Sequence, residues 1–590
     1  MTGSGNSSTA SQRGFSKMGP AASRRDFIRQ GSGWLAGAVL AGSSGITFSA
    51  ETSRRPNILL ILADDLGFSD LGCYGGEIQT PTLDALAAGG LRFTEFYNSA
   101  RCCPSRASLL TGLYPHQAGM GAMDNDQGAP GYRGHLNDQC VTIAEVLRGA
   151  GYRTLMSGKW HLSKPGPIDR GFEEFFGLLH GFDSYWNAAR YSRLPEGRPR
   201  REYPEGRFYS TDAISDHALD FIAEARRTKD KPFFLYLAYN APHFPLHAPK
   251  EEIAKYADLY RKGWDAVREE RYARMKKMGL LDPRWPLSPR SIIGPNRVST
   301  PGGFADKQNP AWDSIDADRR ADLARRMAVY AAAVDRMDQG IGRVIADLRA
   351  NRQLDNTLIL FLSDNGACAE WDPWGFDEKS GPTNVLHKGA DLDALGGPGT
   401  YISYGSGWAN ACNTPLTLYK HYAHEGGIST PLIVHWPAGM KRQGEIDPRP
   451  GHLTDVMATC VEVAGATYPK SVDGRDILPP EGQSLIPAMR GEPAKERTLF
   501  FEHEGNRAVR RGKWKLVALA NRPWELYDED ADRVERKNVA AEHPDLVREM
   551  SEQWDVWARR CNVLREPAKE KGAPGKTKGR KKQGNEKAGA

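Results

Sequence analysis

Four apolar runs that each end in polar side chains are the feature that most limits how this chain can fold. The stretch PNILLILADDLG ends in Asp64 and Asp65, and NTLILFLSDNGA ends in Asp364 and Asn365. YRTLMSGKWHL and PFFLYLAYNAPH have the same layout. Runs of this kind are typical of buried strands, and an open parallel α/β sheet binds ligands at the carboxyl ends of its strands. We therefore predict an α/β fold with a large, mostly parallel sheet flanked by helices, and a functional site at one edge.

The pattern of apolar residues changes after about residue 490. Short alternating runs there indicate antiparallel strands, and a segment with apolar residues at helical spacing follows them. We expect a smaller C-terminal α+β subdomain. The predicted organisation is an export signal at 1–50, a main domain at 51–490, the subdomain at 491–566 and a disordered basic tail at 567–590.

The positive charge of the chain is concentrated at its two ends. Residues 1–50 hold five Lys and Arg against one Asp, and residues 567–590 hold eight against two Glu. Between them, residues 51–566 carry 66 positive against 70 negative side chains. Since nucleic-acid binding needs a basic face, we expect no nucleic-acid partner.

The first fifty residues have the layout of an export signal. Arg24 and Arg25 form a twin-arginine pair in SRRDFIR, and an uncharged Gly-, Ala- and Leu-rich run continues to Ala50. Positive residues followed by an apolar run are typical of secretory signals. We predict twin-arginine export to the periplasm or beyond, with cleavage near Ala50 and no stable membrane anchor; a retained anchor is the alternative.

The two acidic strand ends predict a metal site. Asp64, Asp65, Asp364 and Asn365 supply carboxylate and amide oxygens, which suit Ca²⁺, with Mg²⁺ as the second choice, better than a soft metal. A single such pair would more often cap a helix or shape a turn. Two pairs at equivalent strand ends favour the metal.

Two adjacent cysteines, Cys102 and Cys103, need a separate explanation, because neighbouring cysteines seldom bond each other. The segment that they begin, CCPSRASLLTG, resembles the signature of the formylglycine-dependent sulfatases at every defined position. The resemblance implies that a maturation enzyme oxidises Cys102 to Cα-formylglycine (3-oxoalanine), whose hydrate is the nucleophile. Cys103 then occupies the variable position, and no role for it follows from the sequence.

Further segments match the family in order, namely ADDLG, GKWHL, APHFPLHAP, SDNG and YKHYAHEGGISTPLIVHWP. The chain thus resembles a sulfatase of the alkaline-phosphatase-like superfamily, closest in pattern to bacterial arylsulfatases. By this resemblance the metal ligands are Asp64, Asp65, Asp364, Asn365 and the modified Cys102. Arg106 holds the diol and the carboxylates in place, and Lys159 and Lys420 bind sulfate oxygens. His243 is the acid for the departing alcohol, and His161 is the base for the second step.

The resemblance implies hydrolysis of sulfate esters, of aryl sulfates or related compounds, to an alcohol and inorganic sulfate. The expected partners are a sulfated small molecule or glycan and the maturation enzyme. Three alternatives stay open: a phosphonate or phosphate ester hydrolase of the same superfamily, a carbohydrate sulfatase, and a binding protein with a dead site. His116, Trp186, Tyr404 and Trp408 either line the substrate pocket or belong to the core or surface.

The other six cysteines show no Cys-x-x-Cys spacing and no zinc pattern. We expect most of them to be buried and inert, with room for one disulfide.

Overall fold

The computed structural model of the protein describes residues 55–228, 230–292, 307–370, 373–378 and 383–563. The predicted export signal and basic tail lie outside the described residues. Among the helices that are described, none combines the length and the apolar character needed to cross a membrane.

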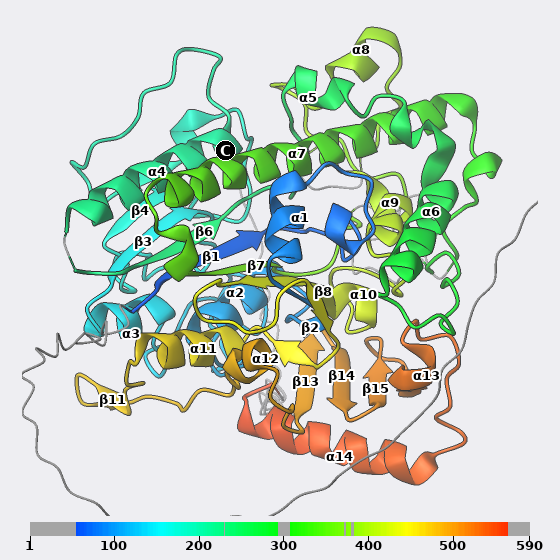
Figure 1. The fold of residues 1–590 in the computed structure, drawn as a ribbon. Coiled ribbons are helices and arrows are strands. Elements are labelled where there is room, and N and C mark those ends of the chain that lie inside the picture. Colours follow the sequence, from blue (N-terminus) through cyan, green and yellow to red (C-terminus); the bar gives the residue numbers. More distant parts are fainter. Residues whose placement is uncertain (1–54, 229, 293–306, 371–372, 379–382, 564–590) are drawn as a thin grey trace, which may run out of the picture. The chain divides into compact units, whose positions relative to one another are not determined.

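A large sheet forms the centre of residues 55–563 (Figure 1). Its strand order is β10-β2-β8-β7-β1-β6-β3-β4-β5, with β9 paired to β2. Neighbouring strands are mostly parallel, but β8 runs antiparallel to β2 and β7, and β5 to β4. The predicted fold class is confirmed. The strands are β1 Asn57–Ala63, β2 Leu91–Tyr97, β3 Arg153–Gly158, β4 Glu174–Gly177, β5 Ser192–Leu194, β6 Phe233–Ala238, β7 Thr357–Ser363, β8 Ser429–His435, β9 Glu445–Asp447 and β10 Gly451–His452.

Helices cover both faces of this sheet, which explains why its central strands are continuous apolar runs. Leu59 and Ile61 of β1 pack in one core with α1, α4 and α7, and Ile58 and Leu60 pack in a second core with α2, α3 and α11 (Figure 1). The helices are α1 Pro81–Ala88, α4 Ser210–Arg227 and α7 Ala317–Ala350 on the first face, and α2 Cys102–Thr111, α3 Ile143–Gly149 and α11 Asp455–Ala464 on the second.

Local sequence signals set several helix starts. The hydroxyl of Thr142 accepts a hydrogen bond from the backbone of Glu145, whose carboxylate accepts one from the backbone of Thr142, so a capping box begins α3. Asp316 caps α7 with its side chain, which accepts a hydrogen bond from the backbone of Arg319. The remaining helices of the main body are α5 Lys250–Ala254, α6 Gly263–Met278, α8 Gly389–Ala394, α9 Gly405–Cys412, α10 Glu425–Ile428 and α12 Ile486–Arg490.

The C-terminal part contains the predicted antiparallel strands and closing helix. Strands β13 Thr498–His503, β14 Asn506–Arg511, β15 Trp514–Ala518 and β16 Glu525–Asp528 form one sheet in chain order, followed by α13 Glu529–Asp532 and α14 Pro544–Arg560. One face of this sheet packs on α14 through Val509 and Trp557. The other face packs on the main body through Phe501 and Tyr97. A separate hairpin joins β11 Ser471–Val472 to β12 Arg475–Asp476.

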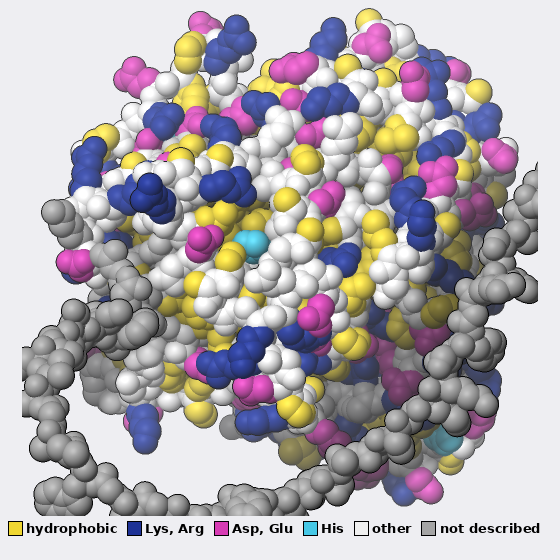
Figure 2. Space-filling view, in the orientation of Figure 1, with side chains coloured by type: hydrophobic (Ala, Val, Ile, Leu, Met, Phe, Trp, Pro, Cys, Tyr) yellow, Lys and Arg dark blue, Asp and Glu magenta, His cyan; other side chains and the backbone are white. Residues whose placement is uncertain are grey.

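All eight cysteines lie in the described residues, and each is buried and unpaired. On the face drawn in Figure 2, basic and acidic side chains are interspersed among apolar ones. This mixture agrees with the near balance of charge over residues 51–566.

Candidate active site

Four neighbouring parallel strands, in the order β7-β1-β6-β3, end at one edge of the sheet. This is the arrangement that the four apolar runs predict, because parallel strands bring their carboxyl ends together. Each strand is followed by the polar residues singled out in the sequence: Asp364 and Asn365 after β7, Asp64 and Asp65 after β1, His243 after β6, and Lys159 and His161 after β3.

Helix α2 brings two more predicted residues to this edge. Cys102 is its first residue, and every residue of the helix is buried. Arg106 lies one turn later and donates from Nε and Nη2 to Oδ2 of Asp364, at 3.2 and 2.9 Å. Its Nη2 is also 3.4 Å from Oδ1 of Asp64. One guanidinium therefore holds carboxylates from two different strands.

Asp65 is surrounded by nitrogen atoms from three other segments. Lys420, from the loop between α9 and α10, places Nζ 2.8 Å from Oδ1, and Asn365 donates from Nδ2 to the same oxygen at 2.7 Å. Nε2 of His243 lies 3.4 Å from Oδ2. The backbone of Asp65 is left-handed, with φ of 68°, a conformation that costs energy and is concentrated at functional sites.

Two buried oxygens at this cluster have no hydrogen-bond partner, namely Oδ1 of Asp64 and Oδ1 of Asn365. Unpaired buried polar atoms are costly. In addition, burial and the charge of Asp64 raise the pKa of Asp364 well above its ordinary value. A hard divalent cation among these residues would bind the unpaired oxygens and stabilise the charged form of Asp364. The donor set therefore fits Ca²⁺ or Mg²⁺.

The two predicted lysines are buried beside carboxylates. Lys159 donates from Nζ to Oδ2 of Asp64 at 2.6 Å. Burial raises the pKa of Asp64, but positive charges, chiefly that of Lys159, outweigh it and hold the pKa below its usual range. For Lys420, burial lowers the pKa, yet the charge of Asp65 brings it well above the ordinary value. The Lys420 side chain thus keeps its positive charge beside Asp65.

His243 is held in one orientation and is neutral near pH 7. Its Nδ1 is 2.5 Å from the carbonyl oxygen of Phe244, so Nδ1 carries the proton and Nε2 has a free lone pair. Nε2 lies 3.5 Å from Nζ of Lys420. Burial lowers the pKa of His243 to about 4, against the opposing charge of Asp65.

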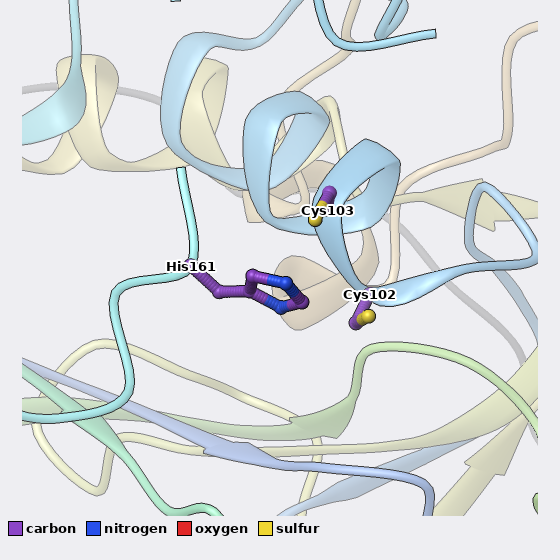
Figure 3. Close-up of side chains that lie close together, drawn as sticks. All are labelled: Cys102, Cys103 and His161. Carbon is purple, nitrogen blue, oxygen red and sulfur yellow. The ribbon is translucent and has the colours of Figure 1, made fainter. Parts of the chain in front are cut away.

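His161 points toward the first turn of α2, where Cys102 and Cys103 lie (Figure 3). A nitrogen of its ring and the two sulfur atoms are all within 4.8 Å of one another. A hydrogen bond from Cys103 is the main cause that lowers the pKa of the Cys102 thiol, whereas burial raises that of Cys103. Burial also lowers the pKa of His161.

The structure adds residues at the site that the motifs did not identify. Asp124 places Oδ2 3.9 Å from Nε2 of His161. Arg101 donates to Glu370 at 2.7 Å and contacts His421, the residue after Lys420. Phe182 is 41% exposed and stacks beside the ring of His243, with centroids 6.0 Å apart. Only its aromatic character could have suggested a role.

The aromatic candidates from the sequence lie elsewhere. Tyr404 and Trp408 are buried in the main core, and Trp186 packs against that core. His116 is buried and pairs with Glu502 at 2.8 Å. We assign these four residues to packing.

Comparisons with known proteins agree with this geometry. The Sulfatase family profile matches residues 56–466, and the profile of the C-terminal part of N-sulphoglucosamine sulphohydrolase matches residues 417–557. An uncharacterized sulfatase of Schizosaccharomyces pombe is 35% identical over 549 residues, which cover 87% of this chain and 95% of that protein. An arylsulfatase of Klebsiella aerogenes is 36% identical over 485 residues, covering 79% of this chain and 97% of that protein.

A solved structure, that of Ps i-CgsB in complex with k-i-k-neocarrahexaose, has the same fold, with a TM-score of 0.59 and 25% identity over 85% of this chain and 93% of that one. The family resemblance carried by CCPSRASLLTG is confirmed. This chain belongs to the sulfatase family.

Proposed function

We propose that this protein hydrolyses aryl sulfates, with a nucleophile made from Cys102 and with Ca²⁺ at the carboxylate cluster. As a sulfatase it is a sulfuric ester hydrolase; the aryl substrate, the modified residue and the ion are the proposed parts. The observation that carries the proposal is the cluster of carboxylates and buried cations at one sheet edge, where Arg106, one turn after Cys102 on α2, binds Asp364. The similarity to the arylsulfatase of Klebsiella aerogenes supports the aryl substrate.

The charges at the site suit a sulfate monoester. Asp64, Asp65 and Asp364 are balanced by Arg106, Lys159 and Lys420. A divalent ion therefore leaves two positive charges, which match the one negative charge of a sulfate ester and one deprotonated nucleophile. A phosphate monoester brings about one more negative charge near neutral pH, since its second pKa is about 6. The balance favours sulfate over phosphate.

Several residues around position 102 would orient and activate the nucleophile. Asp64, Asp65, Asp364 and Asn365 would hold the ion, which would supply the positive charge that makes a nearby hydroxyl more acidic. Formylglycine at position 102 would, as its hydrate, supply one hydroxyl as the nucleophile and a second hydroxyl whose loss of a proton would let sulfate leave. Arg106 fixes the carboxylates, and Lys159 is placed to bind a sulfate oxygen.

Lys420 and His243 together fit the role of the acid. The neutral His243 has no proton on Nε2, but the ammonium of Lys420 lies 3.5 Å away. The departing oxygen can take a proton from Nε2 once Lys420 has supplied it, because Nδ1 stays bonded to the carbonyl of Phe244. The base of the second step is His161, whose buried Nδ1 has no hydrogen-bond partner.

Phe182 supports an aromatic leaving group. It lies beside the histidine that we assign to the departing oxygen, and its ring is partly open to solvent. Aromatic rings in contact contribute about 0.5–1.5 kcal/mol beyond the area that they bury. An aryl sulfate would place its ring there.

The test compares substrates on protein whose maturation has been verified. Peptide mass spectrometry should show an aldehyde at position 102 and a thiol at 103. Nitrophenyl sulfate should be hydrolysed with a higher kcat/KM than a nitrophenyl phosphonate or a sulfated monosaccharide, and Cys102→Ala should abolish turnover. Full activity with an unmodified Cys102, or preference for the phosphonate, would overturn the proposal.

We also propose that the chain is exported by the twin-arginine route and is matured by a formylglycine-generating enzyme. The Arg24–Arg25 pair supports the first part, and the CCPSR motif supports the second. Replacing both arginines with lysine should keep the protein in the cytoplasm, as followed by fractionation. Unchanged export would contradict the assignment.

A further inference from the structure

Cys103 lies beside the proposed nucleophile, and the sulfatase reaction as proposed gives it no task. It is fully buried, adjacent to Cys102 on the first turn of α2. Its sulfur, the sulfur of Cys102 and a ring nitrogen of His161 lie within 4.8 Å of one another (Figure 3). Two thiols and an imidazole are the ligands that zinc prefers, and three such ligands with one open position form a known zinc arrangement.

We propose that the unmodified protein binds Zn²⁺ through Cys102, Cys103 and His161, and that conversion of Cys102 destroys this site. The inference rests on the proposed function only in taking Cys102 as the residue that is converted. On binding, the two thiols lose their protons to solvent and their sulfur atoms coordinate the ion. The fourth position is left to water.

The distances allow this coordination with small movements. Zn–S bonds of about 2.3 Å and Zn–N bonds of about 2.0–2.1 Å place neighbouring ligand atoms of a tetrahedral site roughly 3.5–4 Å apart. The three side chains need to approach each other by only about an ångström from their present positions. Side-chain rotation can supply such a movement.

The surroundings of His161 also suit a metal ligand. Nδ1 is buried and has no hydrogen-bond partner, so an ion bound there would displace no existing hydrogen bond. Nε2 faces Oδ2 of Asp124 at 3.9 Å. A ligating histidine usually directs its other nitrogen at a carboxylate, which fixes the tautomer and strengthens the ligand.

This site differs from the carboxylate cluster in its net charge and in the ligand atoms that it offers. One Zn²⁺ with two thiolates and a neutral imidazole adds no net charge to a buried position, which limits the desolvation cost. The charge of Lys159 is paired with Asp64, at 2.6 Å. Ca²⁺ prefers oxygen ligands, so the two ions do not compete for the same atoms.

Loss of one sulfur removes the site. Once Cys102 becomes an aldehyde hydrate, Cys103 and His161 remain as two ligands, too few for a closed or open zinc site. The same chemistry that creates the nucleophile therefore ends zinc binding. Zinc would mark the fraction of protein that escaped maturation.

The experiment uses full-length protein made without the maturation enzyme, with the thiol at position 102 verified by peptide mass. Zn²⁺ is titrated under reducing conditions, with Ca²⁺ present, against a chromophoric chelator. We expect one Zn²⁺ per chain, and at least about tenfold weaker binding in Cys103→Ala, Cys103→Ser and His161→Ala. Co²⁺ in place of zinc should give thiolate-to-metal charge-transfer absorption that Cys103→Ala diminishes.

Two variants serve as matched controls. Cys460→Ala removes another buried thiol, and His503→Ala disrupts a second group, His421, His503 and Glu504, that has the spacing of metal ligands. Both should keep the zinc affinity of the unmodified protein. Circular dichroism checks that each variant is folded.

The inference is wrong if folded, unmodified protein binds no zinc, if Cys103→Ala and Cys103→Ser bind it unchanged, or if fully converted protein binds it equally well. Loss of binding in His503→Ala alone would place the ion at the other group and also overturn it. The proposed function fails separately, because converted protein that binds no zinc but hydrolyses no sulfate ester would leave this inference standing.

Discussion

Arg106 and Asp364 form a buried two-donor contact in which Nε and Nη2 both bond to Oδ2, at 3.2 and 2.9 Å. The other oxygen, Oδ1, accepts a hydrogen bond from the backbone of Asp65 at 3.2 Å. Asp364 is thus fixed in orientation by its neighbours before any ion binds. The geometry of the predicted metal site depends on a side chain that is not itself a ligand.

Arg106→Lys should keep the charge and lose this orientation, because an ammonium cannot reproduce the planar fork of a guanidinium. We expect kcat/KM for nitrophenyl sulfate to fall by about 100-fold, the scale of a small misplacement at a reacting centre. Arg511→Lys, at a surface pair with Glu549, is the control and should be neutral. Activity of Arg106→Lys close to that of the parent would refute this role.

Removing divalent ions should lower the melting temperature, and Ca²⁺ or Mg²⁺ should restore it. Ligand at 100 times its Kd stabilises a protein by about 2.7 kcal/mol. Asn365→Leu, which deletes a buried unpaired oxygen, should lose most of this gain in differential scanning calorimetry. Asn351→Leu at the exposed end of α7 serves as control; equal gains in both variants would exclude Asn365 as a ligand.

His243→Ala should widen the rate difference between good and poor leaving groups. An alkyl sulfate releases an alkoxide that needs a proton, whereas nitrophenolate leaves with little help. We therefore expect a much larger loss of kcat/KM on the alkyl substrate. Asp364→Ala should harm both substrates alike. If His243→Ala lowers both rates equally with its fold intact, the side chain positions sulfate instead of carrying the proton.

Lys515→Met should be strongly destabilising, although it lies far from the predicted nucleophile in the sequence. Its buried Nζ lies 2.8 Å from Glu425 of the main body and 2.8 Å from Glu535. Removing one member of a buried ion pair costs about 3–5 kcal/mol, because the partner charge stays buried. Lys513→Met, at a half-exposed pair with Asp528, should change the free energy of unfolding by at most about 1 kcal/mol. Equal effects in urea unfolding would disprove the distinction.

Acid should destabilise the fold through buried histidines such as His217. Burial lowers its pKa to about 4, from the ordinary value of 6.5. The unfolded chain therefore binds more protons between these two values, and stability falls as the pH drops below about 6.5. His217→Phe keeps a ring stacked on Phe176 and should reduce the loss between pH 7.5 and pH 5 by about 2 kcal/mol. An unchanged pH profile would show that His217 does not contribute.

The sequence predicted the central strands because they are buried on both faces and therefore read as unbroken apolar runs. Asp64 and Asp364 could be paired across the sheet, since their strands end in the same way. The antiparallel strand β8 was not predicted, because its direction depends on its partners β2 and β7 and leaves no periodic signal.

The site residues divide in the same manner. His161, His243 and Lys420 were predicted from motifs. Phe182 and Asp124 were not, because they lie on loops and no residue spacing in the sequence indicates their contacts. The ion pair of Lys515 with Glu425 joins residues 90 positions apart, and only the fold brings them together.

Cys102 is 1% exposed and begins a helix whose residues are all buried. A second protein cannot bind this segment once α2 is packed in the core. An enzyme that modifies Cys102 must therefore act before the chain has folded. The proposed conversion of Cys102 would therefore compete with folding, and the relative rates of the two would set the yield of active protein. Maturation enzyme added after folding should leave the Cys102 thiol unchanged, however long the incubation.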